Sequence, residues 1–471
     1  MQIKLLYLDD LSTWNEFSQM TSLQMIFNTA ANKFRPVYYF ILKLCYKLFL
    51  PRVYLFGIFT LMFNFFIIAL LFYVIFKITN KPLVAFLGST IYTVSRFAYY
   101  NISQVHGIME QMALGLAILV LFLLWLYIEK SNKNYFYMAC IFLFIIPFVH
   151  ERYIALYPLF VLAVILGTKS DKFDKLKCFI LSAVTFVVPF YIRILFLKDR
   201  AFDGTGGTNM KETFNFKDFF RHFKSGLLYL FGINDGPAYL NGIEQSNVLP
   251  WVKSLNIVFV VIVSIVAGLY IFFLVKNKDK KDKMKKQLKL MALLVSFIFL
   301  TLICACATIR LEMRWIYTPY VGFIILLSNM IAFIHTHVNL SIKKYFCIVV
   351  SFSMLCVIIP AELYFRNNYK NIYYWSTYQI YNSVFDQTVA RYRDELWTKK
   401  LVMVSKDAVV FGENGTDLQT SLKMIAPDKT VNLEMYNDVK NIPANYYSDD
   451  SKIILTIDSY NQKVVNLKDI I

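Results

Sequence analysis

Apolar residues in this chain collect in blocks, and short polar turns separate the blocks. Most blocks are long enough, at about 20 residues with almost no charge, for a helix to cross roughly 30 Å of hydrocarbon. About ten transmembrane helices are expected, near 52–77, 82–100, 109–129, 134–149, 154–168, 177–197, 254–276, 288–308, 316–336 and 344–365. The pattern predicts an all-α polytopic membrane protein that lies in the lipid bilayer of a cell membrane.

Composition supports this prediction, since 58% of the 471 residues are hydrophobic and 17% are aromatic. The net charge of +18 could suggest nucleic-acid binding. However, a dense lysine cluster between Lys276 and Lys289 separates two apolar blocks, as in a short cytoplasmic loop, and no folded basic module accompanies it. We therefore expect no nucleic-acid partner. The seven cysteines lie mostly within apolar blocks and are interpreted as packing residues.

Lysine in alternate loops predicts the orientation. The loops near Lys77, Lys130, Lys172, Lys276 and Lys343 all fall on one side by strict alternation, and the positive-inside rule makes that side cytoplasmic. The intervening segments, 1–51, 101–108, 150–153, 198–253, 309–315 and 366–471, are then extracytoplasmic. These segments hold nearly all the polar side chains other than lysine.

Two domains are expected. Residues 1–365 form the transmembrane domain, with large outer loops at 1–51 and 198–253, and residues 366–471 form a small extracytoplasmic α/β domain. Strand-like runs at 401–404 and 453–457 flank a predicted helix at 418–426. Within the second outer loop, a flexible glycine run at 203–207 precedes an aromatic and basic stretch at 214–223 that suits the membrane interface.

An acidic pair, Asp9-Asp10, precedes the first apolar block. A buried carboxylate near a membrane surface can have a raised pKa and can act as a general base toward a sugar hydroxyl. The alternative is a helix cap, in which Asp10 or Ser12 starts a short helix. On spacing alone both interpretations stay open.

Two further outer turns carry candidate binding residues. Arg35, followed by a proline suited to a helix start, can clamp a phosphate, although it could equally be an interfacial anchor. Glu110 opens a span at membrane depth, where an ionisable group costs about 2.5–3.5 kcal/mol, so we expect it to face a polar cavity. The alternative is a favourable charge at a helix N-terminus. His106 belongs to the same turn and could be a simple loop histidine.

Charged residues also fill the last two short outer turns. His150, Glu151 and Arg152 lie between the two shortest apolar blocks, in a turn that could dip into the membrane. They predict either a polar floor of an active site or a structural Glu151–Arg152 pair. The final turn contains two arginines suited to phosphate, next to aromatic residues that could form an interface belt; its residues are Arg310, Glu312, Arg314, Trp315 and Tyr317.

This arrangement resembles the GT-C superfamily of integral-membrane glycosyltransferases, which use polyprenyl-phosphate sugars. In that family an acidic residue or pair occupies the first extracytoplasmic loop, where this chain has Asp9-Asp10, and an Arg-Pro element such as Phe34-Arg35-Pro36 ends the loop. His150-Glu151 is similar to a later acidic turn, and Arg310–Arg314 to arginines that hold the lipid phosphate. The resemblance covers roughly residues 5–365. Members of the family begin with a membrane helix that places the acidic loop on the outer side. In this chain, Lys4–Leu8 would be only the last turn of such a helix. We therefore expect a first helix to be missing upstream of Met1.

The resemblance implies an inverting transfer of a sugar from a polyprenyl-phosphate donor to a cell-envelope glycan, polymer or lipid. Asp10 is the expected general base, with Asp9 or Glu110 as its orienting partner, and Arg35, Arg310 and Arg314 lie near the phosphate. No cofactor is required, although a divalent cation could bridge carboxylate and phosphate. The main rival is a lipid-linked glycan flippase or other transporter; a third hypothesis is a non-catalytic assembly partner.

Overall fold

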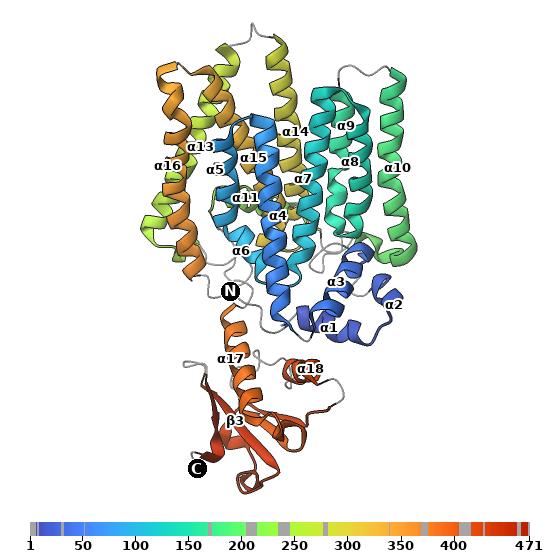
Figure 1. Ribbon diagram of the computed structural model, residues 1–471, viewed down its shortest axis with the longest axis vertical. Helices are drawn as coiled ribbons and strands as arrows, with labels where there is room; N and C mark the ends of the chain where they lie inside the picture. Colours follow the sequence, from blue (N-terminus) through green and yellow to red (C-terminus); the bar gives the residue numbers. More distant parts are fainter. Residues whose placement is uncertain are drawn as a thin grey trace.

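The fold is a long helical bundle with a small α/β domain at one end, as the computed structural model shows (Figure 1). The structure describes residues 6, 9–29, 33–50, 52–167, 172–203, 214–233, 245–276, 281–338, 340–368, 375–404, 416–426, 429–458 and 463–469. The glycine run at 204–207 and most of the stretch from Lys4 to Leu8 lie outside these residues.

Within the described residues, seven helices are long and apolar enough to cross a membrane. They are α4 (Tyr54–Thr79), α7 (Gly107–Lys130), α10 (Lys172–Leu197), α13 (Pro250–Lys276), α14 (Lys281–Cys306), α15 (Met313–His337) and α16 (Leu340–Asn368). α7 and α15 are mostly buried and form the centre of the bundle, whereas α10 and α13 expose most of their apolar side chains. The protein is therefore a multi-pass helical membrane protein.

The expected number of ten spans is not confirmed, because three of the apolar blocks form shorter helices. These are α5 (Pro82–Val94), α8 (Lys133–Ile145) and α9 (Tyr157–Leu166). At a rise of 1.5 Å per residue, the 13-residue helices are only about 20 Å long. α5 ends where Ser95 caps the next helix, α6 (Arg96–Ile102), by accepting a hydrogen bond from the backbone N–H of Ala98.

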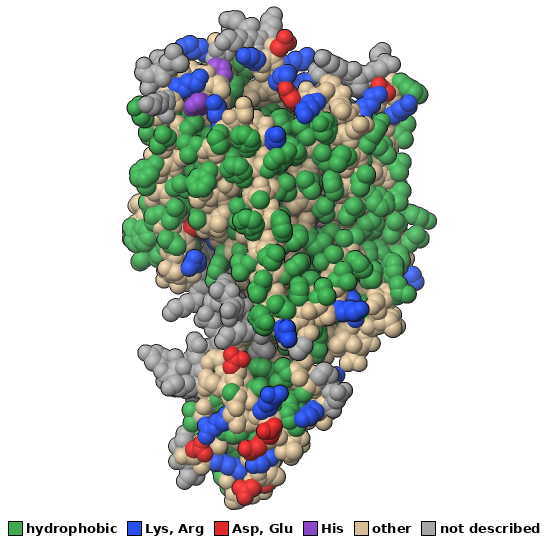
Figure 2. Space-filling view, in the orientation of Figure 1, with side chains coloured by type: hydrophobic (Ala, Val, Ile, Leu, Met, Phe, Trp, Pro, Cys, Tyr) green, Lys and Arg blue, Asp and Glu red, His purple; other side chains and the backbone are tan. Residues whose placement is uncertain are grey.

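The two ends of the bundle differ in charge. Hydrophobic side chains cover its middle, and Lys and Arg side chains gather at the end away from the α/β domain (Figure 2). That end, where α13 ends and α14 begins, is called the lysine end below. The opposite end, called the site end, carries α1 (Asp9–Ser18), α2 (Ser22–Ile26), α3 (Pro36–Phe49) and α6 (Figure 1).

An amphipathic helix, α11 (Phe216–Leu230), packs against α14 and α15. It buries His222 and Tyr229 and exposes Phe216 and Phe220. Gly226 allows the close approach, because a Cβ atom there would lie 2.7 Å from a methyl carbon of Leu302. The predicted aromatic and basic stretch is thus an amphipathic helix, and its place at a membrane interface stays a prediction.

The C-terminal domain contains a four-stranded sheet in the order β2-β1-β3-β4. β1 (Lys400–Val404) runs parallel to β2 (Leu433–Tyr436) and β3 (Lys452–Asp458), and β4 (Lys463–Asn466) is antiparallel to β3. The helices are α17 (Trp375–Tyr392) and α18 (Thr416–Ile425). The two predicted strands and the predicted helix of this domain are confirmed.

The two faces of this sheet pack into different cores, because side chains alternate along a strand. Leu401 and Met403 join the large core that continues into the bundle, whereas Val402 and Val404 belong to a separate cluster with Ile454. α18 packs on α1, and the buried leucines of α18 share the large core with α1. Short 3-10 turns complete the chain: η2 (Ile146–Phe148), η3 (Glu151–Leu156), η4 (Lys198–Phe202), η6 (Gln245–Asn247), η8 (Glu395–Trp397), η11 (Val439–Asn441), η12 (Ala444–Tyr446) and η13 (Leu467–Asp469).

Candidate functional site

A cavity of about 310 Å³ lies at the site end of the bundle. Its walls come from α1, from the N-terminal half of α3, from the start of α7, from the turn before η3 and from the start of α15. The lining residues are Asp9, Ser12, Thr13, Glu16, Phe17, Lys33, Arg35, Tyr38, Tyr39, His106, Met109, Glu110, His150, Arg314 and Trp315. Segments more than 300 positions apart in the chain therefore meet here.

Helix α1 forms one wall of the cavity. It buries Leu11, Trp14 and Phe17 on its inner face, and the Phe17 ring meets Tyr39 edge to face with centroids 5.1 Å apart. Asp9 and Asp10 both lie in the first turn, where a negative charge is favourable toward the helix dipole. The short helix expected here is present, but it begins at Asp9, so Asp10 and Ser12 lie inside it and neither is its N-cap.

The two aspartates have different surroundings. Asp9 is exposed and lines the cavity, whereas Asp10 is 7% exposed and is not among the lining residues. The carboxylate of Asp10 accepts hydrogen bonds from the backbone N–H groups of Val105 at 2.8 Å and His106 at 2.9 Å. It also contacts Nδ1 of His106, whose Nε2 lies 3.3 Å from Oγ1 of Thr13. Asp10 therefore anchors the turn ahead of α7.

Arg35 and Glu151 form a buried bidentate ion pair. Nε and Nη2 of Arg35 each donate to Glu151 at 2.8 Å, and Nζ of Lys33 lies 3.6 Å from the same carboxylate. Burial opposes the ionisation of Glu151, but the charges of Arg35, His150 and Lys33 and the hydrogen bonds from Arg35 together hold the pKa of Glu151 well below its ordinary value. Burial lowers the pKa of Lys33, against the attraction of Glu151. Of the two interpretations of this turn, the structural Glu151–Arg152 pair is wrong, because Glu151 binds Arg35 instead.

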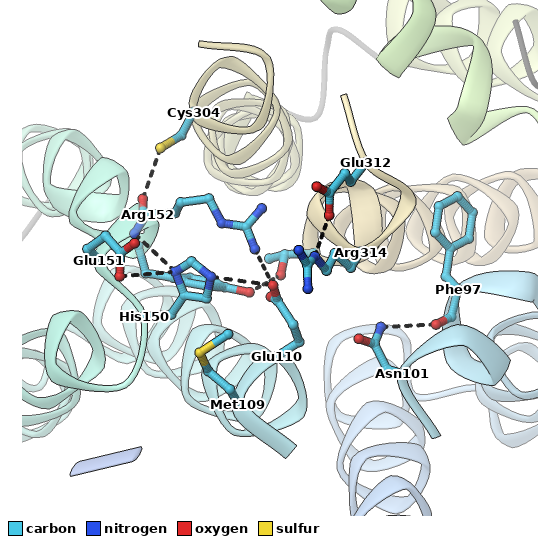
Figure 3. Close-up of polar contacts among 12 residues, drawn as sticks. Phe97, Asn101, Met109, Glu110, His150, Glu151, Arg152, Cys304, Glu312 and Arg314 are labelled. Atoms are coloured by element: carbon cyan, nitrogen blue, oxygen red, sulfur yellow. Dashed lines mark hydrogen bonds and ion pairs between the residues drawn. The ribbon is translucent and has the colours of Figure 1, made fainter. Parts of the chain in front are cut away.

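Arg152 pairs with Glu110, which lies between it and Arg314 (Figure 3). Nη2 of Arg152 is 2.5 Å from Oε1 of Glu110, and Nε2 of His150 is 3.4 Å from the same oxygen. The guanidinium of Arg152 also lies over the Trp315 ring, 5.4 Å from its centroid. Glu110 is in the first turn of α7 and is 2% exposed, so the prediction that it faces a polar cavity is confirmed.

The last predicted turn forms a three-residue cluster. Buried Glu312 contacts Arg310 at 2.7 Å and Arg314 at 2.5 Å. Of the three, only Arg314 lines the cavity, and the side chain of Arg310 is more exposed to solvent. The aromatic-belt interpretation of Trp315 and Tyr317 is wrong, because both rings are buried and Trp315 lines the cavity. Neighbouring helices bury these rings more completely than an interface would.

Several buried polar atoms around the cavity have no partner among the described residues. They are the Tyr38 hydroxyl, Nε1 of Trp315 and Oε2 of Glu110. Buried polar groups in proteins are almost always satisfied, so these atoms are suited to hydrogen bonds with a ligand or with water in the cavity. The cavity therefore offers both donors and an acceptor besides its charged groups.

The structure brings most of the predicted site residues together. Asp9, Arg35, His106, Glu110 and Arg314 line the cavity, while Asp10, Glu151 and Arg152 contact these residues from behind, and Arg310 and Glu312 form the neighbouring cluster.

Sequence reasoning missed other lining residues. Ser12, Thr13 and Glu16 lie three, four and seven positions after Asp9, a helical spacing that could have identified them. Nothing in the local sequence marks Tyr38 or Lys33.

Gly107, the first residue of α7, allows the turn between α6 and α7 to lie close to α6. A Cβ atom there would lie 1.7 Å from the backbone oxygen of Asn101, an atom that cannot move aside. We expect Gly107→Ala to lower the free energy of unfolding by about 1–3 kcal/mol, as overpacking does, and to displace His106. Thermal unfolding in detergent measures this. The matched control is Gly268→Ala in α13, where no atom lies within 4 Å. Equal melting temperatures for the two variants would contradict the prediction.

No group of three or more His, Cys, Asp or Glu side chains in the described part of the chain could hold a metal ion. A bridging divalent cation stays a prediction, and no chemical step below is routed through one. No protein-family model and no curated protein matches the chain. The geometry of the cavity therefore carries the functional argument: charged groups of both signs and open hydrogen-bonding groups surround one space at the end of a membrane-embedded bundle.

Proposed function

We propose that this protein is an extracytoplasmic glycosyltransferase of GT-C type. It moves a sugar from a polyprenyl-phosphate carrier to a hydroxyl group of a cell-envelope glycan, polymer or lipid. The observation that supports this most is the mixed lining of the cavity, in which carboxylates and imidazoles share one space with cationic groups. The acidic and imidazole residues are Asp9, Glu16, Glu110, His106 and His150, and the cationic residues are Lys33, Arg35 and Arg314.

The cationic groups suit the phosphate of the donor. Two of the three nearby arginines are largely neutralised, Arg35 by Glu151 and Arg152 by Glu110. Lys33 lies farther from Glu151, and Arg314 shares Glu312 with Arg310, so both keep positive charge to offer. A phosphate here would gain charge-assisted hydrogen bonds while its lipid tail lies along the helices in the bilayer.

The chemistry that these groups support is a single displacement. The acceptor oxygen attacks the anomeric carbon, the bond from that carbon to the phosphate oxygen breaks, and the configuration inverts. The released phosphate gains negative charge, which Lys33 and Arg314 stabilise. The acidic pair supplies the base, either directly or through His106, and Oε2 of Glu110 is placed to accept a hydrogen bond from a sugar hydroxyl. A base of this kind contributes about 10²–10⁴-fold in rate.

The sidedness follows from the charge of the two ends. By the positive-inside rule, the lysine end faces the cytoplasm. The cavity and the C-terminal domain, which lie at the site end (Figure 1), then face outward, where polyprenyl-linked sugars are used without nucleotides.

The test is glycosyl transfer by the purified protein in detergent. Synthetic polyprenyl-phosphate hexoses serve as donors, solubilised envelope glycans serve as acceptors, and release of polyprenyl phosphate is measured. We expect Asp10→Asn and Glu110→Gln each to lower the rate by about 10²-fold or more. The exposed Asp469→Asn, in the C-terminal domain, is the control and should leave the rate unchanged.

Two outcomes would contradict the proposal. Transfer at the wild-type rate in both Asp10→Asn and Glu110→Gln would remove the catalytic role of the site. Movement of lipid-linked sugar across vesicle membranes, with no release of polyprenyl phosphate from any donor, would favour a flippase or another transporter.

A further inference from the structure

We infer that His106 is the catalytic base of this site and that Asp10 is a positioning residue that acts through it. The inference rests on the proposed function and deepens it, because it names the group that takes the proton of the acceptor. It also departs from the expectation that a carboxylate does so directly.

The carboxylate of Asp10 is already occupied by other groups of the protein. Oδ2 accepts from the backbone N–H of Val105, and Oδ1 accepts from the backbone N–H of His106 and contacts Nδ1 of its ring. These contacts engage both oxygens of the carboxylate. Asp10 is also buried and lies outside the lining of the cavity. To reach an acceptor hydroxyl, its side chain would have to abandon the turn that it holds.

Asp10 orients the imidazole of His106. A carboxylate at Nδ1 favours the tautomer that carries its proton there, so that Nε2 keeps a lone pair. His106 lines the cavity, and Nε2 lies near Oγ1 of Thr13, which can donate to it in the absence of an acceptor. The Tyr38 ring packs at 59° to the imidazole with centroids 6.1 Å apart, which limits rotation of the ring.

The other candidate bases of the cavity are less well placed. Asp9 and Glu16 are exposed, so water competes for their carboxylates. Oε1 of Glu110 is taken by Arg152, and His150 is completely buried beside the same carboxylate. Among the described lining residues, His106 is the one that combines access to the cavity with a carboxylate fixed behind it, which is the arrangement that makes an imidazole an effective base.

As the acceptor oxygen bonds to the anomeric carbon, its proton passes to Nε2 of His106, and the electron pair of the breaking bond leaves on the phosphate. Asp10 stabilises the imidazolium that forms. The imidazolium returns its proton to water after the products leave.

Chemical rescue tests this assignment. We expect His106→Ala to lower the rate about 10²-fold or more, with little change in donor KM, and added imidazole to restore part of the lost rate. His106→Asn, whose amide can still donate to Asp10, should be equally slow while keeping the wild-type melting temperature. Asp10→Asn should be slow and not rescued by imidazole, because the ring of His106 still occupies its place. The control is His337→Ala at the C-terminal end of α15, which should remain fully active.

Combining the substitutions adds a second readout. Because Asp10 acts through His106, the double variant Asp10→Asn/His106→Ala should be no slower than His106→Ala alone. A folded His106→Asn variant with the wild-type rate would overturn the inference, as would a double variant in which the two losses multiply. Neither result removes the proposed function if the wild-type protein transfers sugar, whereas absence of transfer by the wild-type protein from every donor refutes the proposed function itself.

Discussion

Arg35→Ala is expected to lower the free energy of unfolding by about 3–5 kcal/mol, the cost of leaving one member of a buried ion pair without its partner. Arg35 is 7% exposed and Glu151 is 9% exposed, and their contact is bidentate. Without the guanidinium, the carboxylate of Glu151 keeps, among the described residues, the more distant Lys33 and His150 as ion-pair partners. The pair also connects α3 to the turn before α9, so the cavity should lose its shape.

Thermal unfolding of the detergent-solubilised protein measures this effect. The control is Arg391→Ala, because Arg391 pairs with Asp469 and both side chains are about half exposed. An exposed pair of this kind contributes about 0–1 kcal/mol. The double variant Arg35→Ala/Glu151→Ala should recover part of the loss, since it removes the unpaired charge. A loss for Arg35→Ala no larger than that for Arg391→Ala would contradict the assigned role.

The same pair predicts a pH dependence. Burial opposes ionisation of Glu151, but Arg35 lowers its pKa well below the ordinary value of 4.5 in the folded protein. The stabilisation is therefore fully present above that ordinary value and is lost as the pH falls toward the lower pKa of the folded state. The difference in stability between wild type and Arg35→Ala should stay constant near neutral pH and shrink under strongly acidic conditions.

Leu422→Ala is expected to lower the free energy of unfolding by about 2–5 kcal/mol and to impair the proposed sugar transfer as well. Leu422 is completely buried in α18, which packs on α1. The core residues of the two helices belong to one cluster. Because α1 supplies one wall of the cavity, a loosened α18 should let that wall move, so donor KM should rise even at temperatures where the protein remains folded.

The matched control for Leu422→Ala lies on the other face of the sheet. Ile454 is also completely buried, but it belongs to the separate cluster with Val402 and Val404. Ile454→Ala should destabilise the C-terminal domain without changing donor KM. If the two variants change KM equally, the contact between α18 and α1 has no specific role in shaping the cavity.

Hydrophobic patterning located the helical blocks but could not establish which of them span the membrane. An apolar side chain is buried equally well by lipid and by neighbouring protein, so composition does not separate a spanning helix from a short core helix. The block at 82–100 is interrupted because Ser95 caps a new helix, and the blocks around His150 are shortened by 3-10 turns packed inside the bundle. Such interruptions depend on contacts with other helices.

The sequence predicted many of the residues at the candidate site but not which of them form ion pairs with one another. Alternation of the loops placed Asp9, Glu110, His150 and Arg314 at one end of the bundle, and the structure joins them around one cavity. Sequence neighbours suggested that Glu151 would pair with Arg152, whereas each binds a partner from a distant segment. Ion pairs form between groups that packing brings together, and adjacent residues in a turn often point apart.

The sequence by itself determined that this chain folds as a membrane-embedded helical bundle with a charged end and a small α/β domain, because hydrophobic length and strand alternation are local properties. Only the tertiary structure decided how the acidic pair is used. Adjacent residues on a helix point about 100° apart. The packing of α1 against α18 and the hydrogen bonds from the turn ahead of α7 therefore direct Asp9 toward the cavity and Asp10 toward the backbone of that turn and the ring of His106.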